Sequence, residues 1–113
     1  MKTVFPAHSK KLFYFRMHIS KFILEKGYVP LNPFMLFEYF MLDSVDRKVV
    51  IEANNSLVKK TDELWVFGQI SDGVLDEIKL AKIEKKPLRY FKVINSKEIK
   101  EISEEEAEIE KEE

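Results

Sequence analysis

The sequence of 113 residues contains no cysteine and only three glycines, and its net charge is close to zero. The absence of cysteine excludes disulfides and thiolate chemistry, and it fits a reducing, cytoplasmic location. Acidic and basic residues are interspersed along the body of the chain, so the basic stripe of a nucleic-acid-binding protein is missing. No apolar run reaches the roughly 20 residues that span a bilayer, and the N-terminus lacks a signal-peptide pattern. We therefore expect a soluble cytoplasmic protein without a nucleic-acid or membrane partner.

Histidine and glutamine are also scarce. His8 and His18 lie ten residues apart, which is not a metal-ligand spacing, so we expect one loop histidine and one helix histidine, with no metal and no other cofactor. Gln69 is the only glutamine beside many lysines and glutamates, a bias associated with thermophiles. A chain of this length forms one domain with a real core. It is short for an enzyme that builds its site unaided, so we expect a homodimer.

The first quarter of the chain predicts a strand and a helix. Thr3–Phe5 is a short β-prone run, and Pro6, which cannot donate to a sheet ladder, should end it in a loop. Apolar residues then recur at helical spacing over residues 10–26. Ser9 is a suitable N-cap for this helix, and Gly27 follows its last turn.

The next part of the chain predicts an edge strand and two helices. Residues 28–31 form a brief β-prone run that contains Pro30, which suits a sheet edge. Residues 34–42 are apolar apart from Glu38, and a helix that is apolar all round serves as a subunit interface, a lid over a site or plain core. Residues 45–60 predict an amphipathic helix, whose buried stripe comprises Val49, Val50, Ala53, Leu57 and Val58.

A strand, a tight loop and a helix follow, and the rest of the chain is organised around them. Leu64–Phe67 is an unbroken apolar run, typical of a strand covered on both faces. The apolar stripe of the helix after the loop comprises Val74, Leu75, Ile78 and Ala81. Residues 88–93 predict a fourth strand. The α/β domain should span residues 1–94, and residues 95–113 should form an acidic tail with at most a short strand, followed by a solvated helix or a disordered segment.

Together these elements predict an α/β fold. The alternation of strands and helices indicates a small doubly wound, Rossmann- or flavodoxin-like parallel sheet of about four to five strands in a three-layer α/β/α sandwich. In such sheets, ligands bind at the carboxyl ends of the strands, where helix N-termini favour anions. We therefore expect a ligand crevice between the strand at residues 64–67 and the helix that follows it.

Glu77, in that helix, is the first candidate functional residue. It lies at the edge of the apolar stripe, and no lysine is placed to pair with it along the helix, whereas Asp76 has Lys79 three residues on. A glutamate in an early helical turn also complements the helix dipole, so a structural role stays open. Asn54 is the second candidate, because it shares a face with apolar residues. It is either a core amide with satisfied hydrogen bonds or a ligand contact.

The segment Ser71-Asp72-Gly73-Val74-Leu75-Asp76-Glu77-Ile78, followed by Ala81 and Lys86-Pro87, resembles the nucleoside 2-deoxyribosyltransferase-like superfamily. Members carry a glycine, a glutamate four residues on, then an alanine and Lys-Pro, and the preceding strand opens, as here, with Asp62. Residues 29–33 resemble the family's second strand and loop, and Phe5-Pro6 resembles its first. The resemblance extends over most of residues 3–93, and it implies the same doubly wound fold.

The resemblance also implies a reaction. In that family the glutamate matching Glu77 is the nucleophile, which attacks the anomeric carbon of a deoxyribosyl group; an acceptor base or water then resolves the covalent intermediate. The transition state is oxocarbenium-like, and a carboxylate stabilises it as in retaining glycosidases. Asp72 would act as an acid or contact a sugar hydroxyl, or it caps the helix. Phe5 and Tyr14 would stack on a base, or they belong to the core.

Two positions depart from the family's pattern. Six residues before the glutamate, transferases usually carry an aspartate that binds the 5′ end of the sugar, and Ser71 stands there in this chain. Ser71 and Gly73 look closer to the branch that hydrolyses deoxynucleoside 5′-monophosphates, because a hydroxyl and free helix amides suit a phosphate. Asn54 stands eight residues before Asp62, where the family commonly has an aspartate near the base. An amide can hydrogen-bond there, but it has no titratable proton.

The resemblance thus implies cleavage of an N-glycosidic bond, or deoxyribosyl transfer, on a nucleoside or nucleotide. The implied catalytic residues are Glu77 and Asp72, and the implied substrate-binding residues are Phe5, Asn54, Ser71 and Gly73. Two alternatives stay open. One is a non-catalytic nucleotide-binding module of the same fold, and the other is a structural or interaction protein that uses residues 34–42 and the acidic tail.

Overall fold

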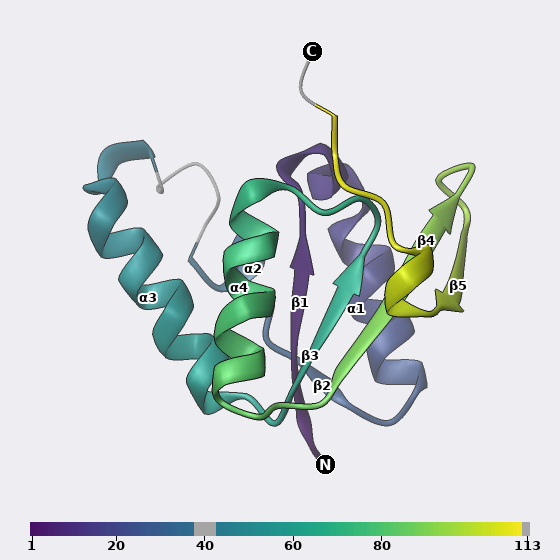
Figure 1. The fold of residues 1–113 in the computed structure, drawn as a ribbon, viewed down its shortest axis with the longest axis horizontal. Helices are drawn as coiled ribbons and strands as arrows, with labels where there is room; N and C mark the ends of the chain where they lie inside the picture. The colour runs from purple at the N-terminus through teal and green to yellow at the C-terminus, as the bar shows by residue number, and fades with distance from the viewer. Residues whose placement is uncertain (38–42, 112–113) are drawn as a thin grey trace.

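A computed structural model describes residues 1–37 and 43–111 of the chain (Figure 1). Within these residues, five strands form one sheet in the order β2-β1-β3-β4-β5, in which only β5 runs antiparallel to its neighbour. The strands are β1 (Thr3–His8), β2 (Val29–Pro30), β3 (Glu63–Phe67), β4 (Leu88–Ile94) and β5 (Glu98–Ile102). The helices are η1 (Lys10–Phe15), α1 (Arg16–Glu25), α2 (Pro33–Leu36), α3 (Arg47–Lys60), α4 (Asp72–Ile83) and η3 (Glu104–Glu106).

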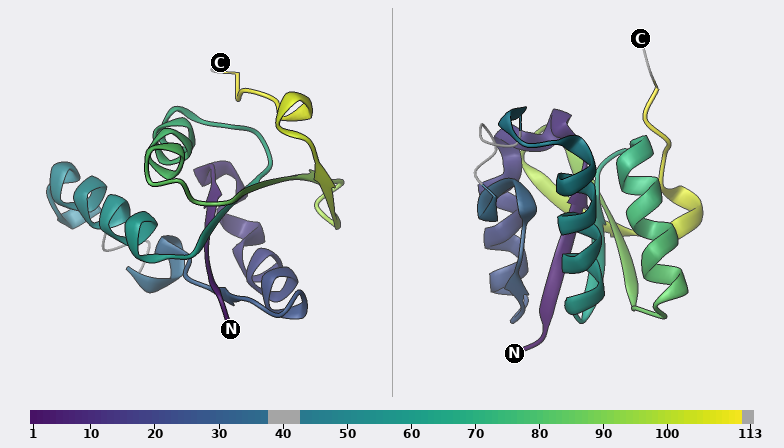
Figure 2. Two further views of the ribbon diagram at one scale, coloured as in Figure 1. Left: turned by 60° about the horizontal axis from the view of Figure 1, so that its bottom comes forward. Right: turned by 90° about the vertical axis from the view of Figure 1, so that its left-hand side faces the viewer.

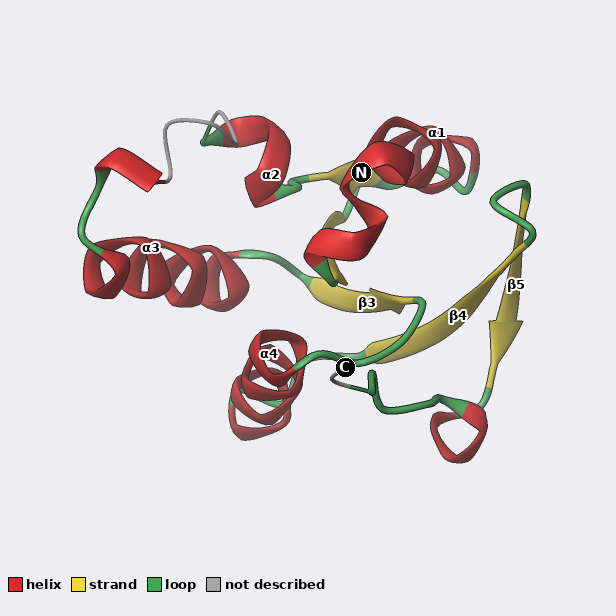
Figure 3. Cartoon of the chain, turned by 90° about the horizontal axis from the view of Figure 1, so that it is seen from above, coloured by secondary structure: helices red, strands yellow, loops and turns green. Residues whose placement is uncertain are grey.

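Helices cover both faces of this sheet, as Figures 2 and 3 show. On one face, α1 packs over an aromatic cluster that includes Trp65, Phe67 and Phe91. On the other face, α3 and α4 pack over a second cluster that includes Phe5 and Val66. Every residue of β3 is buried because the strand is covered from both sides, as its unbroken apolar run predicts. The predicted doubly wound three-layer α/β/α fold is confirmed.

The strand β1 is longer than predicted, because Pro6 lies inside it and does not end it. The carbonyl of Val4 accepts a hydrogen bond from the amide of Leu31 on the β2 side, and strand alternation turns the Pro6 nitrogen to the same side. The pairing between β1 and β2 stops at Val4, so no partner there requires a donor from Pro6. The strand therefore continues to His8, which is a strand residue and not the expected loop residue.

The predicted helices are present, with differences at their ends. Residues 10–26 form η1 and α1, with the Ser9 side chain capping the first turn and Gly27 at a φ of 87° after the last. The helix α3 begins at Arg47, after Asp46 as N-cap. The predicted stripe of α3 is wrong at Val49, which is 55% exposed. The N-terminal half of α3 diverges from α4 and extends past the core (Figure 1).

The predicted apolar helix over residues 34–42 is described only in part. The helix α2 ends at Leu36, and Met35 and Leu36 are both exposed, so they do not serve as plain core. Residues 38–42 of this prediction lie outside the described residues. Within residues 1–37 and 43–111, the chain has no helix that is long and apolar enough to cross a membrane.

The acidic C-terminal segment packs back onto the sheet. Residues 98–102 form the antiparallel edge strand β5, and η3 follows with Ser103 and Glu106 in a capping box. Further on, Ile109 pairs with Ile70 in a parallel bridge, so the segment runs beside the loop between β3 and α4 (Figure 1). The expected tail therefore contributes to the same end of the sheet as the carboxyl ends of β1 and β3.

Candidate functional site

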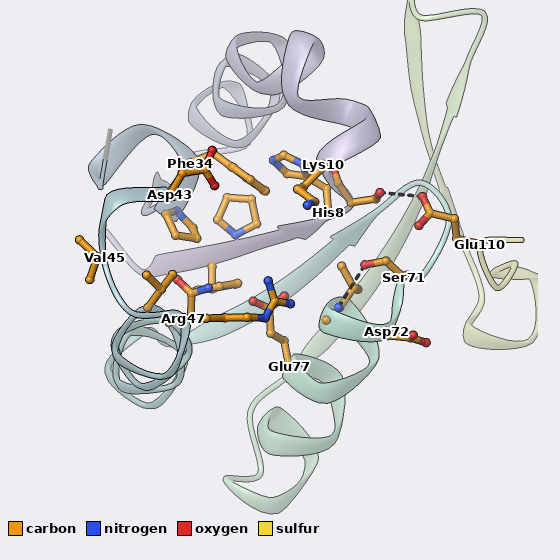
Figure 4. A pocket seen from close by; sticks show the side chains of 18 residues that line it. His8, Lys10, Phe34, Asp43, Val45, Arg47, Ser71, Asp72, Glu77 and Glu110 are labelled. Carbon is orange, nitrogen blue, oxygen red and sulfur yellow. Dashed lines mark hydrogen bonds between the residues drawn. The ribbon is translucent and has the colours of Figure 1, made fainter. Parts of the chain in front are cut away.

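A cavity of about 680 Å³ opens where β1 and β3 end. The order of strands reverses at β1, with β2 on one side and β3 on the other, and doubly wound sheets bind ligands at such a switch point. The walls come from the end of β1, from α2, α3 and α4, and from the C-terminal segment (Figure 4). The six residues predicted from the sequence all line this cavity: Phe5, Asn54, Ser71, Asp72, Gly73 and Glu77.

Ser71 and Gly73 lie at the N-terminal end of α4. Ser71 is the N-cap, and its hydroxyl accepts a hydrogen bond from the amide of Val74 at 3.3 Å. The first amides of a helix have no partner within the helix, and the helix dipole favours negative charge beside them. Gly73 adds no side chain to this turn, and nothing lies within 4 Å of where a Cβ would stand. This end of the cavity therefore offers hydrogen-bond donors to a ligand.

Glu77 lies one turn further along α4, with its side chain facing the cavity (Figure 4). The side chain is half-buried, and among the described residues it forms no ion pair. Burial raises the pKa of the Glu77 carboxyl to about 8, and the neighbouring Asp76 carboxylate adds to this rise. A titratable group with a strongly raised pKa in a cavity is a typical feature of a functional site.

Asn54 faces the cavity from α3. Its Oδ1 atom is buried and has no hydrogen-bond partner within the described part of the chain. A buried acceptor without a partner is costly in the free protein, so a donor from a ligand would relieve it. Of the two readings that the sequence left open, the geometry favours the ligand contact over the satisfied core amide.

The other predicted residues are placed less favourably. Phe5 lies in the core with no exposed surface and forms part of the cavity wall, so it offers little face for stacking. Asp72 is the first residue of α4 and not its N-cap; its side chain is exposed and points away from Glu77 (Figure 4). Tyr14 is 60% exposed and its hydroxyl hydrogen-bonds with Ser96, away from this cavity. Tyr14 therefore belongs neither to the core nor to the site.

A buried histidine at the cavity was not predicted from the sequence. The ring of His8 stacks on Phe34, with 4.8 Å between the ring centroids, and both residues line the wall. Asn32 donates from its side chain to His8 Nε2 at 3.1 Å and accepts the amide of Phe34 at 2.9 Å, which starts α2. Desolvation lowers the pKa of His8, so the ring is neutral at ordinary pH. The sequence did contain an indication, because residues at the end of a first strand lie at the switch point. His8 was overlooked because the strand was expected to end at Pro6.

Charged residues at the rim were also missed. Arg47 and Lys10 line the cavity as cations, and Asp43 and Glu110 line it as anions. Arg47 follows the N-cap of α3, and Figure 4 shows its side chain reaching over the cavity on the Glu77 side. Glu110 comes from the acidic C-terminal segment, whose composition carries no sign of such a position. Within the described residues, no group of three or more potential ligands could hold a metal ion.

This arrangement places two partly buried carboxyls, those of Glu77 and Glu110, among hydrogen-bonding groups, an aromatic wall and mixed charges. Such a cavity suits a polar ligand of moderate size with a planar part, in which the planar part packs against Phe34 and the polar part reaches the N-terminus of α4.

Comparison with known proteins covers most of the residues that build this cavity. A search of curated proteins finds no match to the chain. One family model matches residues 6–91, which include the end of β1, α2, α3 and α4 and exclude the C-terminal segment. By this match, the chain belongs to the family described as a domain of unknown function, DUF7768.

Proposed function

We propose that the protein cleaves the N-glycosidic bond of a nucleoside or nucleotide, or transfers the deoxyribosyl group, with Glu77 as the nucleophile. One observation carries this proposal. Six residues selected from the sequence by resemblance to the nucleoside 2-deoxyribosyltransferase-like superfamily lie on β1, α3, α4 and the loop before α4, and all six line one cavity. A cytoplasmic site of action, expected from the sequence, belongs to the same proposal.

The proposed reaction has two steps. The ionised Glu77 carboxylate attacks the anomeric carbon, the bond from this carbon to the base nitrogen breaks, and the base leaves with the bonding electrons and takes up a proton from water. Water or an acceptor base then displaces Glu77 from the same carbon and loses a proton to the solvent, which frees the carboxylate and gives either the free sugar or a new nucleoside. The carboxylate stabilises the positive charge of both transition states.

The neighbouring residues have supporting roles in this proposal. The Oδ1 of Asn54, which has no partner among the residues that the structure describes, would accept a hydrogen bond from the base, and the side-chain amide would donate to the base as it leaves. Phe34, stacked on His8, would pack against the face of the base. Ser71 and Gly73 would bind the 5′ end of the sugar. Asp72, which is exposed at the rim, would contact a sugar hydroxyl.

The raised pKa of Glu77 gives the proposal a pH dependence. Only the ionised carboxylate is a nucleophile, and with a pKa of about 8 most of the free protein carries the protonated form at neutral pH. The rate at low substrate concentration should therefore rise with pH and level off above about 8.

The test is incubation with nucleosides and with their 5′-monophosphates, followed by chromatography for the free base. Glu77→Ala should abolish base release while the circular dichroism spectrum stays unchanged. Glu84→Ala, at the exposed C-cap of the same helix, is the matched control and should keep full activity. Base release by Glu77→Ala at the wild-type rate would rule out Glu77 as the nucleophile.

A second function is a non-catalytic nucleotide-binding module, and one observation favours it. Glu77 is mostly protonated at neutral pH, and in that form it can donate a hydrogen bond to a ligand but cannot attack an anomeric carbon. A bound ligand raises the thermal midpoint of unfolding by mass action. Stabilisation by nucleosides without any base release, at neutral and alkaline pH, would favour the binding module.

We also propose that the protein acts as a homodimer. Val45, just before α3, and Val49 and Ile51 in the N-terminal part of α3 expose apolar side chains, and a subunit interface would cover them. Size-exclusion chromatography with light scattering tests this directly, and a monomeric mass at all concentrations would exclude it.

A further inference from the structure

The C-terminal segment forms one wall of the cavity. Ile109 pairs with Ile70 in a parallel bridge, in which the amide of Ile70 donates to the Glu108 carbonyl and the amide of Glu110 donates to the Ile70 carbonyl, both at 2.8 Å. The next residues on the two segments are Ser71 and Glu110. The pairing therefore brings Glu110 to the end of the cavity where α4 begins (Figure 4).

The side chain of Glu110 is held inside this wall. It is only 15% exposed, and Ser9 donates its hydroxyl hydrogen to Glu110 Oε1 at 2.6 Å. The ammonium group of Lys11 is 4.0 Å from the same oxygen, but this lysine is largely exposed, so it screens the carboxylate weakly. A carboxylate in such a position keeps a strong field, because little water surrounds it.

The segment before Glu110 is anchored at several points. Tyr90 donates its hydroxyl hydrogen to Glu104 at 2.8 Å, and Lys82 forms an ion pair with the same carboxylate at 2.7 Å. Ala107 packs against the core cluster under α3 and α4. These contacts fix the segment on the folded domain and so fix the position of Glu110 at the cavity.

We propose that Glu110 excludes phosphate groups from the Ser71 end of the cavity and thereby selects nucleosides over nucleoside 5′-monophosphates. The selection of nucleosides rests on the proposed function, whereas the exclusion of phosphate does not.

Electrostatic repulsion would exclude the phosphate. A phosphate bound to the free amides of α4 would carry up to two negative charges to the end of the cavity that Glu110 closes. A sugar hydroxyl at the same place is neutral, and it can donate a hydrogen bond to the carboxylate. Lys10 and Arg47 also line the cavity, but they do not cancel this effect. Two further lining residues, Asp43 and Asp72, carry an equal number of negative charges.

The test compares three variants of the full chain with the wild type. Glu110→Gln removes the charge and keeps an acceptor for Ser9, and Glu110→Asp keeps the charge. Glu108→Gln is the matched control, because Glu108 belongs to the same segment but is exposed and does not line the cavity. Binding of inorganic phosphate, of deoxyadenosine and of deoxyadenosine 5′-monophosphate is measured by NMR titration, which also reports whether each variant is folded.

We expect the wild type, Glu110→Asp and Glu108→Gln to bind the nucleoside at least about tenfold more tightly than its monophosphate, as repulsion between partly buried charges predicts. Glu110→Gln should lose this preference and bind inorganic phosphate about tenfold more tightly than the wild type does. Equal binding of nucleoside and monophosphate by the wild type, or an unchanged ratio in Glu110→Gln, would overturn the inference.

The two proposals can fail separately. If the wild type binds neither nucleoside nor monophosphate while Glu110→Gln gains affinity for inorganic phosphate, the proposed function is overturned and the exclusion is supported. If nucleosides bind but Glu110→Gln gains nothing for phosphate, the exclusion is overturned and the proposed function stands.

Discussion

The Nε2 atom of His8 accepts a hydrogen bond from the side-chain amide of Asn32 at 3.1 Å, while its Nδ1 atom donates to the carbonyl of Ser9 at 3.0 Å. This pairing assigns the neutral ring a single tautomer, because each nitrogen has one partner of the opposite kind. A second proton on Nε2 would face the hydrogens of the Asn32 amide. Desolvation by burial, with a smaller effect from Arg16, accordingly lowers the pKa of His8 below its usual value of 6.5.

This geometry predicts a loss of stability in mild acid that depends on His8. The unfolded chain takes up a proton below about 6.5 and the folded chain resists it, so the free energy of unfolding falls as pH drops below that value. His8→Gln should lose less stability over the same range, after costing about 1 kcal/mol at neutral pH through the lost stacking on Phe34. Urea unfolding at several pH values measures both effects. His18 is exposed, so His18→Gln should keep the wild-type dependence of stability on pH. If His8→Gln also kept it, the loss of stability in acid could not be assigned to His8.

Glu77 should affect stability in the opposite direction. Its pKa is raised in the folded state, so its favourable contribution is complete below 4.5, declines as the unfolded chain ionises, and is lost once pH passes about 8. The Glu77→Gln side chain cannot ionise. Its free energy of unfolding should therefore exceed that of the wild type by about 2–4 kcal/mol in alkaline solution and equal it in acid. The same unfolding series checks this, with Glu84→Gln as the surface control. A parallel shift of the whole profile, with no change in slope, would contradict the raised pKa.

The fold was predictable because its signals are local and repeated. The apolar run at residues 64–67 and the helical stripe of Val74, Ile78 and Ala81 each specify one element, and the order of elements then restricts the topology. The error at Pro6 has a different cause. A proline ends a strand only where the neighbouring strand needs a hydrogen bond from the backbone N–H that proline lacks. Whether β2 extends as far as Pro6 depends on the tertiary structure and cannot be seen in the local sequence.

The site was predictable in part for a similar reason. Ser71 is the N-cap of α4, and Gly73 and Glu77 lie in its first two turns, so a short motif could indicate them. His8 lies in a strand and Arg47 in a helix, and the packing of the whole sheet decides that both reach the cavity. Glu110 reaches the cavity through an isolated bridge far along the chain, and no spacing in the sequence announces that contact.

The unpartnered oxygen of Asn54 predicts a conflict between stability and binding. Asn54→Leu replaces a buried acceptor that has no partner within residues 1–37 and 43–111 by a side chain of similar size, so unfolding should cost about 1–2 kcal/mol more. The same change removes the proposed contact with the base, and nucleoside affinity should fall about tenfold. Chemical unfolding and calorimetric titration measure the two effects. Asn55→Leu, outside the cavity, should leave affinity unchanged; a less stable Asn54→Leu would show that the oxygen is satisfied in solution.

Gly68 lies in the loop before Ser71, and Gly73 lies in the first turn of α4. Replacement by alanine should have opposite effects on stability at these two positions. Gly68 has a φ of 76°, and a Cβ there would lie 2.6 Å from Cδ1 of Leu12, so Gly68→Ala should destabilise the protein by about 1–3 kcal/mol. Gly73→Ala meets no atom within 4 Å and gains helix propensity, so stability should stay equal or rise by up to about 1 kcal/mol.

The binding of ligands separates the two variants further. Gly73→Ala adds a methyl group to the cavity wall beside the first amides of α4, so it should weaken nucleoside binding although its fold is intact. Gly68→Ala should show normal affinity at temperatures where it remains folded, because Gly68 does not line this cavity. Thermal unfolding with and without nucleoside measures both properties in one experiment. If Gly73→Ala binds as well as the wild type, the 5′ end of the ligand does not lie on the N-terminus of α4.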